Sequence, residues 1–137
     1  MKRALVVLIL LFGACLDARV IELTKANFSQ VAESQIPVII DVKASWCGQC
    51  KMMQPVMEEA SQKYQGRVLF AAIDIDSQNE LANSYDITLL PTILFIRAGE
   101  RVPTMKNVGA MSKKDFEARI EEFLRTYEPI RNVERKR

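Results

Sequence analysis

Beyond its first 19 residues, the chain alternates short apolar runs with amphipathic segments. The runs are typical of strands buried in a sheet and cover residues 20–23, 38–42, 68–73 and 92–96, and a further strand is expected at 102–108. Helical spacing between and after the runs predicts helices at 24–32, 47–64, 77–84 and from 112 to about 124. This order predicts an α/β domain in which a mixed central sheet is covered by helices on both faces.

The sequence also suggests where several of these helices begin and end. Thr24 is expected to cap the first helix and Gly66 to end the second, and Ser77 with Glu80 has the capping-box form for the third. The charged segment 126–137 contains a proline. We expect it to be a basic, solvated and partly disordered tail rather than an anchor to an anionic surface.

The first 18 residues have the layout of a secretory signal peptide. Lys2 and Arg3 precede an apolar run at residues 4–12, and small residues follow the run. The run is shorter than the ~20 residues that a membrane-spanning helix needs. The folded domain is therefore expected to occupy residues 19–125.

Two ways of processing the N-terminal segment are open, besides its retention as an uncleaved anchor. Cleavage after Ala18 would release the domain, whereas residues 11–15 resemble a relaxed lipoprotein box in which Cys15 becomes the lipidated first residue. Both predict a location outside the cytoplasm, periplasmic or secreted, with the domain either free or tethered to a membrane through its N-terminus. Disulfides persist in such compartments.

Charge and composition exclude several classes of function. The formal net charge is +2, and residues 19–124 alone carry 12 basic and 14 acidic side chains, so the basic excess lies at the two ends. This distribution argues against a nucleic-acid partner. The sequence contains no histidine, which excludes a Ser-His or Cys-His catalytic pair and a His-ligated zinc site. We expect no metal and no bound cofactor.

The candidate chemistry lies at Cys47 and Cys50, two cysteines separated by two residues at the start of a predicted helix. A helix N-terminus stabilises a thiolate, and this motif among alternating strands and helices is typical of redox-active pairs. A zinc site needs about four ligands, and only Cys15 remains besides this pair. A haem attachment site would need histidine in place of Lys51. A purely structural disulfide stays open, although so short a loop stabilises a fold least.

Besides the cysteine motif, further segments of the chain resemble one protein family. The chain from about Val20 to Leu124 resembles thioredoxin, at 38–41, 44–51, 90–92, 99–100 and 108–112 and at Pro55 within the predicted helix. The resemblance implies the thioredoxin fold and thiol–disulfide exchange with protein substrates. Cys47, nearer the helix end, is expected to be the nucleophile that forms a mixed disulfide, and Cys50 to be the resolving thiol.

Asp41 is an acid inside an otherwise apolar strand. A buried charge there would be costly, so its pKa is expected to be raised. The resemblance assigns Asp41 a role as proton relay to or from Cys50. The alternative is an exposed carboxylate at a strand end.

Two departures from the family pattern concern this chemistry. The lysine partner of the buried acid should fall at Ala72 and is absent. Lys43 lies two residues from Asp41, hence on the same strand face, and is the candidate charge near Asp41 and Cys47, with a solvated lysine as the alternative. Gln49 stands where thioredoxins have proline, which predicts a pair somewhat more oxidising than that of a typical thioredoxin.

A second group of residues is expected to bind the client chain. Trp46 offers a flat apolar surface, and Gly48 permits close approach. By resemblance, the Leu90–Pro91 bond is cis and faces the disulfide, so that Leu90 offers its backbone to an extended substrate. The full set expected at this groove is Trp46, Gly48, Gln49, Leu90, Pro91, Gly109 and Ala110.

These features together predict an extracytoplasmic protein-disulfide reductase, expected to be a monomer that receives electrons from a membrane thiol donor. No inserted helical domain separates the predicted strands, which favours a reductase over the oxidants and isomerases of this superfamily. A reductant dedicated to apocytochrome c cysteines is a narrower alternative. A redox-silent binding or chaperone module is the alternative from another class, although such modules tend to have lost one of the two cysteines.

Overall fold

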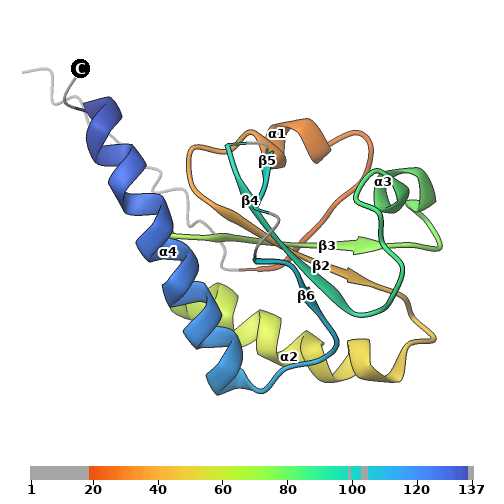
Figure 1. The fold of residues 1–137 in the computed structure, drawn as a ribbon. Helices are drawn as coiled ribbons and strands as arrows, with labels where there is room; N and C mark the ends of the chain where they lie inside the picture. The colour runs from red at the N-terminus through yellow and green to blue at the C-terminus, as the bar shows by residue number, and fades with distance from the viewer. Residues whose placement is uncertain (1–18, 99, 103–104, 136–137) are drawn as a thin grey trace, which may run out of the picture.

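The structure is a computed structural model that describes residues 19–98, 100–102 and 105–135, with side chains up to residue 126. The predicted signal segment with Cys15, and Gly99 of the predicted turn, lie outside these ranges. A twisted sheet forms the centre of the described part, with helices on both of its sides (Figure 1).

The sheet has the strand order β1-β3-β2-β4-β5, and β6 also pairs with β4. The strands are β1 (Ile21–Glu22), β2 (Val38–Lys43), β3 (Leu69–Asp74), β4 (Thr92–Arg97), β5 (Glu100–Arg101) and β6 (Asn107–Val108). β1 and β2 run parallel to β3, whereas β4 is antiparallel to β2, β5 and β6. The prediction of a mixed sheet is therefore confirmed.

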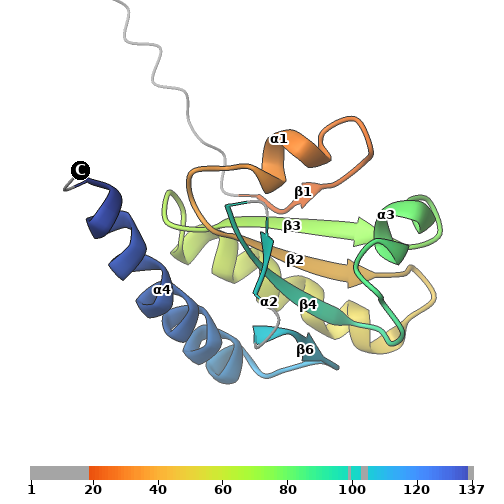
Figure 2. The same ribbon diagram turned by 45° about the horizontal axis from the view of Figure 1, so that its top comes forward.

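The helices cover the sheet in two layers. α1 (Phe28–Ala32) and α3 (Asn79–Asn83) lie on one face, and α2 (Gly48–Lys63) and α4 (Lys113–Arg135) lie on the other (Figures 1 and 2). Alternate side chains of β2 enter the two layers, since Ile39 packs in the α2–α4 core, whereas Val38 and Ile40 pack in the α1–α3 core. Burial on both faces explains why the central strands are apolar over nearly their whole length.

Two helix starts differ from the predictions. α1 begins only at Phe28, because the Asn27 Oδ1 atom accepts the Thr24 N–H (2.8 Å) and forms a turn before the helix. α3 has no side-chain cap, and the Ser77 hydroxyl donates instead to the Asp74 carbonyl (3.4 Å). In each case a short polar side chain, that of Asn27 or that of Ser77, bonds to nearby backbone in the turn before the helix and caps no helix N-terminus.

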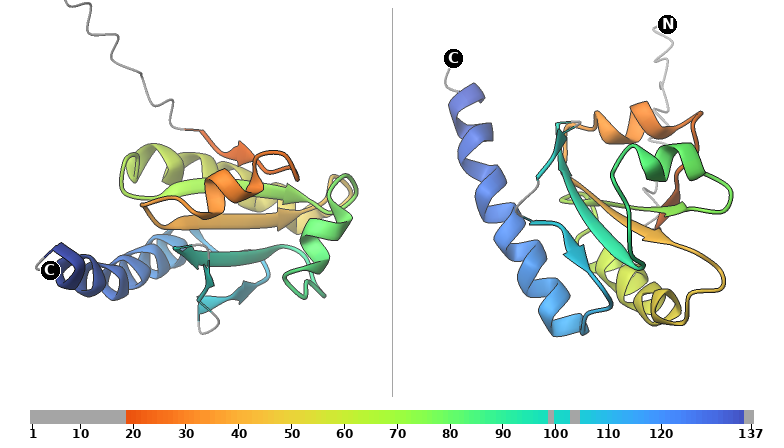
Figure 3. Two further views of the ribbon diagram at one scale, coloured as in Figure 1. Left: turned by 90° about the horizontal axis from the view of Figure 1, so that it is seen from above. Right: turned by 45° about the vertical axis from the view of Figure 1, so that its right-hand side comes forward.

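The C-terminal part also differs from the predictions. Of the strand expected at 102–108, only β6 is a strand among the described residues, and β5 lies at the predicted turn and the residue after it. α4 is longer than expected: its backbone is helical to Arg135, through most of the segment predicted to be a partly disordered tail, and its last turns extend past the sheet (Figure 3). Adding residues to an existing helix is easier than starting one, and Glu and Arg favour it.

Within the described ranges, no helix has both the length and the apolar character needed to cross a membrane.

Candidate functional site

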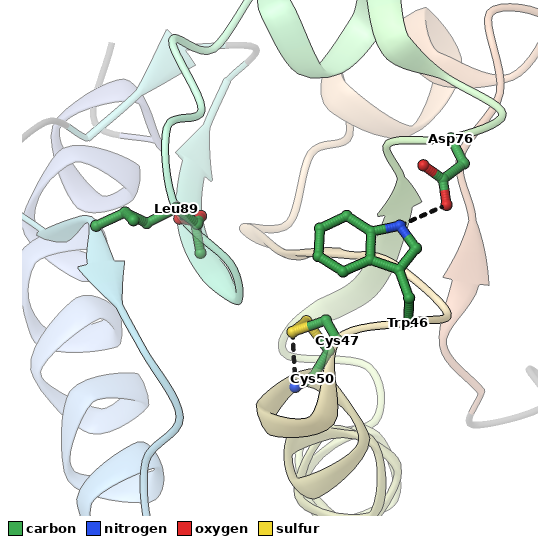
Figure 4. The surroundings of a disulfide bond; sticks show 6 residues. Trp46, Cys47, Cys50, Asp76 and Leu89 are labelled. Atoms are coloured by element: carbon green, nitrogen blue, oxygen red, sulfur yellow. Dashed lines mark hydrogen bonds between the residues drawn. A yellow bond between two sulfur atoms is a disulfide. The ribbon is translucent and has the colours of Figure 1, made fainter.

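The two cysteines lie at the N-terminus of α2 and form a disulfide, with their Cα atoms 5.3 Å apart (Figure 4). Cys47 is the N-cap residue, and its Sγ accepts a hydrogen bond from the Cys50 N–H (3.2 Å). A thiolate at Cys47 would meet this N–H and the positive end of the helix dipole, both of which stabilise negative charge on sulfur. Cys47 is 8% exposed and Cys50 3%, so Cys47 is the more exposed of the two residues, and its role as the nucleophile stays a prediction.

Trp46 forms one wall beside the disulfide, with 67% of its surface exposed (Figure 4). Its indole Nε1 donates a hydrogen bond to the Asp76 Oδ2 (3.0 Å), just after the end of β3. The bond holds the exposed ring in place. Sequence reasoning did not select Asp76; the signal that could have found it is an acid at the carboxyl end of a buried parallel strand, where functional loops gather.

The loop before β4 forms the opposite wall, on which Leu89 is 61% exposed (Figure 4). The Leu90–Pro91 peptide bond is cis, as the resemblance implies, and Leu90 packs against the cluster that contains both cysteines. A hollow of about 450 Å³ lies between the walls and reaches Cys47. None of its lining residues, all of them described, is charged. The hollow therefore suits an uncharged, largely apolar segment of a client.

None of the remaining predicted contact residues lines this hollow. The Gly109 N–H donates to the Pro91 carbonyl (2.8 Å), and its φ of +94° favours glycine. Ala110 lines a separate depression beside α4. Gly48 and Gln49 are exposed in the first turn of α2, and a Cβ atom at Gly48 would meet nothing within 4 Å. The space over Gly48 is therefore open to an approaching chain.

Asp41 is buried in β2 on the face that α2 covers, with 3% of its surface exposed. Its Oδ1 has no hydrogen-bond partner among the described residues. Burial raises the pKa of Asp41 to about 7; the charge of Lys43 acts against this rise and the charge of Glu22 adds to it. The pKa is thus shifted in the predicted direction, and Asp41 is not an exposed strand-end carboxylate. Its role in proton transfer stays a prediction.

Lys43 lines a cavity of about 320 Å³ together with Asp41, so the two side chains share a face of β2 as expected. The Lys43 Nζ lies 2.7 Å from the Glu22 Oε1 of β1, which means that the lysine is held in an ion pair rather than freely solvated. Lys43 also lines a second depression, which contains Cys50 and not Cys47. Glu22 is a residue that sequence reasoning did not select, because only the pairing of strands brings it to Lys43.

Comparisons with known proteins agree with this geometry. The sequence model of the thioredoxin family matches residues 19–122. A thioredoxin of Synechocystis sp. is 35% identical over 104 residues, which are 75% of this chain and 95% of that protein. Thioredoxin 1 of Synechococcus elongatus is 37% identical over 102 residues, 74% and 94% of the two chains. The solved structure of Malassezia sympodialis thioredoxin superposes with a TM-score of 0.70 at 31% identity, over 77% of this chain and 91% of that one.

Proposed function

The chain belongs to the thioredoxin family and is a thiol–disulfide oxidoreductase, and we propose that it reduces protein disulfides outside the cytoplasm. The observation that carries this proposal is the Cys47–Cys50 disulfide at the start of α2, beside an uncharged hollow between Trp46 and Leu89. A dithiol at this position has one sulfur that a client can reach and a second sulfur one turn away that can take over the bond.

The reaction starts from the dithiol form. The Cys47 thiolate attacks one sulfur of a client disulfide, which forms a mixed disulfide and releases the other client sulfur as a thiolate. Cys50 then loses its proton and attacks the Cys47 sulfur, so that the Cys47–Cys50 disulfide forms and the second client sulfur leaves. The client gains two electrons and two protons, and the pair loses both.

Asp41 is the group that we propose to take the Cys50 proton. A carboxyl group whose pKa is about 7 exchanges protons readily near neutral pH, which is the property required of a general base or acid. Gln54 and Lys43 line both the Asp41 cavity and the depression at Cys50, which supports a path for the proton between the two groups.

The location and the electron source rest on the N-terminal sequence. Lys2 and Arg3 before an apolar run, followed by small residues, support secretion, with cleavage after Ala18 or lipidation of Cys15 as its two forms. Outside the cytoplasm the pair needs a thiol donor to return it to the dithiol form. We propose a membrane protein as this donor and a monomeric state for the domain.

Two alternatives differ in what they require of the cysteines. A reductant dedicated to apocytochrome c would use the same chemistry on one client. A redox-silent binding or chaperone module would need no sulfur chemistry, and the disulfide at an accessible helix end favours the redox function over it.

Insulin reduction tests the proposed function. The protein, kept in the dithiol form by dithiothreitol, should accelerate insulin precipitation, because Cys47 attacks the insulin disulfides. The variant Cys47→Ser should fall to the rate of dithiothreitol alone, since a hydroxyl cannot replace the attacking thiolate. Acceleration that survives in Cys47→Ser, or a wild type without acceleration, would rule out the reductase.

The residue between the cysteines should set the redox potential. Gln49→Pro removes an N–H in the first turn of α2 and with it part of the thiolate stabilisation, so the potential should become more reducing by roughly 30 mV, about 1.4 kcal/mol. Gln49→Ala keeps the N–H and serves as the matched control, with an unchanged potential. Titration of each protein against glutathione measures the effect, and a Gln49→Pro potential equal to that of the wild type would contradict the idea.

A further inference from the structure

Three neighbouring strands place two acids on either side of an alanine. Glu22 of β1 is in register with Ala72 of β3, and Ala72 is in register with Asp41 of β2. Residues paired in this way point to the same face of a sheet, here the face covered by α2 (Figure 2). Glu22, Ala72 and Asp41 thus form a row across the three strands. Because Ala72 contributes only a methyl group, this row does not fill the space under α2, and the cavity of about 320 Å³ lies there.

One lysine reaches into this row. Lys43 follows Asp41 by two positions on β2 and lines the same cavity. Its Nζ is bonded to the Glu22 Oε1 at 2.7 Å, whereas the Asp41 Oδ1 has no hydrogen-bond partner among the described residues. The lysine that shares the strand face of the buried acid is therefore held by the more exposed acid.

The other charged groups around Asp41 come from each neighbouring element. Arg19 precedes β1, Glu58 belongs to α2, and both line the cavity. Glu58 accepts a hydrogen bond from the Gln54 side chain (3.3 Å). Asp74 of β3 is in register with Lys43, but its Oδ1 already accepts the Asp76 N–H (2.8 Å). On β4 the residue opposite Asp41 is the uncharged Ile93.

We propose that Glu22 is a positioning residue for the exchange reaction: it competes with Asp41 for Lys43 and so sets how readily Asp41 exchanges a proton with Cys50. This inference rests on the proposed function, because the proton in question is the one that Cys50 loses when it attacks the Cys47 sulfur. In that step the proton passes to the Asp41 carboxylate, the Cys47–Cys50 bond forms and the client leaves as a thiolate. Asp41 afterwards returns the proton to water through the cavity.

Competition of this kind predicts that replacing Glu22 and replacing Lys43 shift the proton affinity of Asp41 in opposite directions. Glu22→Gln removes a negative charge near Asp41 and also frees Lys43 to pair with it, and both changes favour the Asp41 carboxylate. Lys43→Met removes the nearby positive charge, which favours the protonated acid. A purely structural role of the ion pair would not separate the two variants in this way.

The experiment follows the titration of the Asp41 carboxyl carbon by NMR in the oxidised full-length protein, together with the pH profile of insulin reduction. The Asp41 midpoint should fall by about one pH unit in Glu22→Gln and rise by about one in Lys43→Met, a tenfold change in proton affinity each way. The pH profile of insulin reduction should shift in the same direction as the Asp41 midpoint in each of the two variants. Glu22→Asp, which retains the charge, should restore most of the wild-type midpoint. The Glu22 side chain is 61% exposed, so its replacement leaves the cores intact.

A second ion pair of the chain supplies the matched control. Lys25 and Glu80 form a pair between more exposed side chains, and neither residue lines the Asp41 cavity. Glu80→Gln should leave the Asp41 midpoint unchanged. Shifts of the same sign in Glu22→Gln and Lys43→Met, or no shift in either, would overturn the positioning role. A wild type that fails to reduce insulin would instead overturn the proposed function, whatever the midpoints.

Discussion

In the oxidised protein, the stability of Asp41→Asn relative to the wild type should rise by up to about 4 kcal/mol between pH 4 and pH 9. The pKa of this carboxyl is about 7 in the folded protein, against an ordinary value of 3.8. A raised pKa means that stability is full below the ordinary value and is lost as the pH rises through the folded value. Asparagine carries no charge to bury, so the variant should not lose this stability.

Urea unfolding at a series of pH values measures the effect. The free energy of unfolding of the wild type should fall between pH 4 and pH 7 relative to that of Asp41→Asn, with nearly constant differences outside this range. Glu33→Gln alters an exposed carboxyl group and serves as control, with a curve parallel to that of the wild type. Parallel curves for Asp41→Asn as well would show that Asp41 does not titrate as a buried acid.

Replacing Cys50 with alanine should convert the protein from a catalyst into a trap. Cys47 can still attack a client disulfide, but no second sulfur remains to release the client, so turnover should cease and mixed disulfides should accumulate. Adducts that disappear with dithiothreitol should appear on non-reducing gels of cells that express the variant. Mass spectrometry of the adducts would then identify both clients and the thiol donor.

Cys47→Ala is the matched control for the trap. It keeps Cys50, which is only 3% exposed, and so should form few adducts. A similar yield of adducts from both variants would mean that Cys47 is not the preferred attacking sulfur, and a higher yield from Cys47→Ala would assign that role to Cys50.

The long strands were predictable because burial on both faces makes their sequences continuously apolar. β2, β3 and β4 therefore stand out from the sequence, whereas the two-residue strands β5 and β6 are too short to show any periodicity. The helix starts were not predictable at the same level. Thr24 and Ser77 are good caps by composition, and only the structure shows that their groups bond within turns instead.

The residues of the candidate site also fall into those that the sequence reveals and those that only the structure reveals. The cysteine pair and Asp41 are visible in the sequence, because thiols at that spacing and an acid in an apolar strand are unusual in themselves. Glu22 and Asp76 are ordinary surface acids by sequence, and their significance comes from distant partners. Strand pairing brings Glu22 to Lys43, and the loop after β3 brings Asp76 to Trp46. Such contacts depend on tertiary structure, which no local pattern encodes.

Trp46 is the only tryptophan of the chain, and its ring is fixed beside the disulfide by Asp76. A disulfide next to an indole can accept its excitation energy and quench its fluorescence, so the emission of Trp46 should increase when the Cys47–Cys50 bond is reduced. The fluorescence of Trp46 should therefore report whether the cysteine pair is oxidised or reduced. Each turnover with a client or donor can then be timed in a stopped-flow instrument without any dye or label.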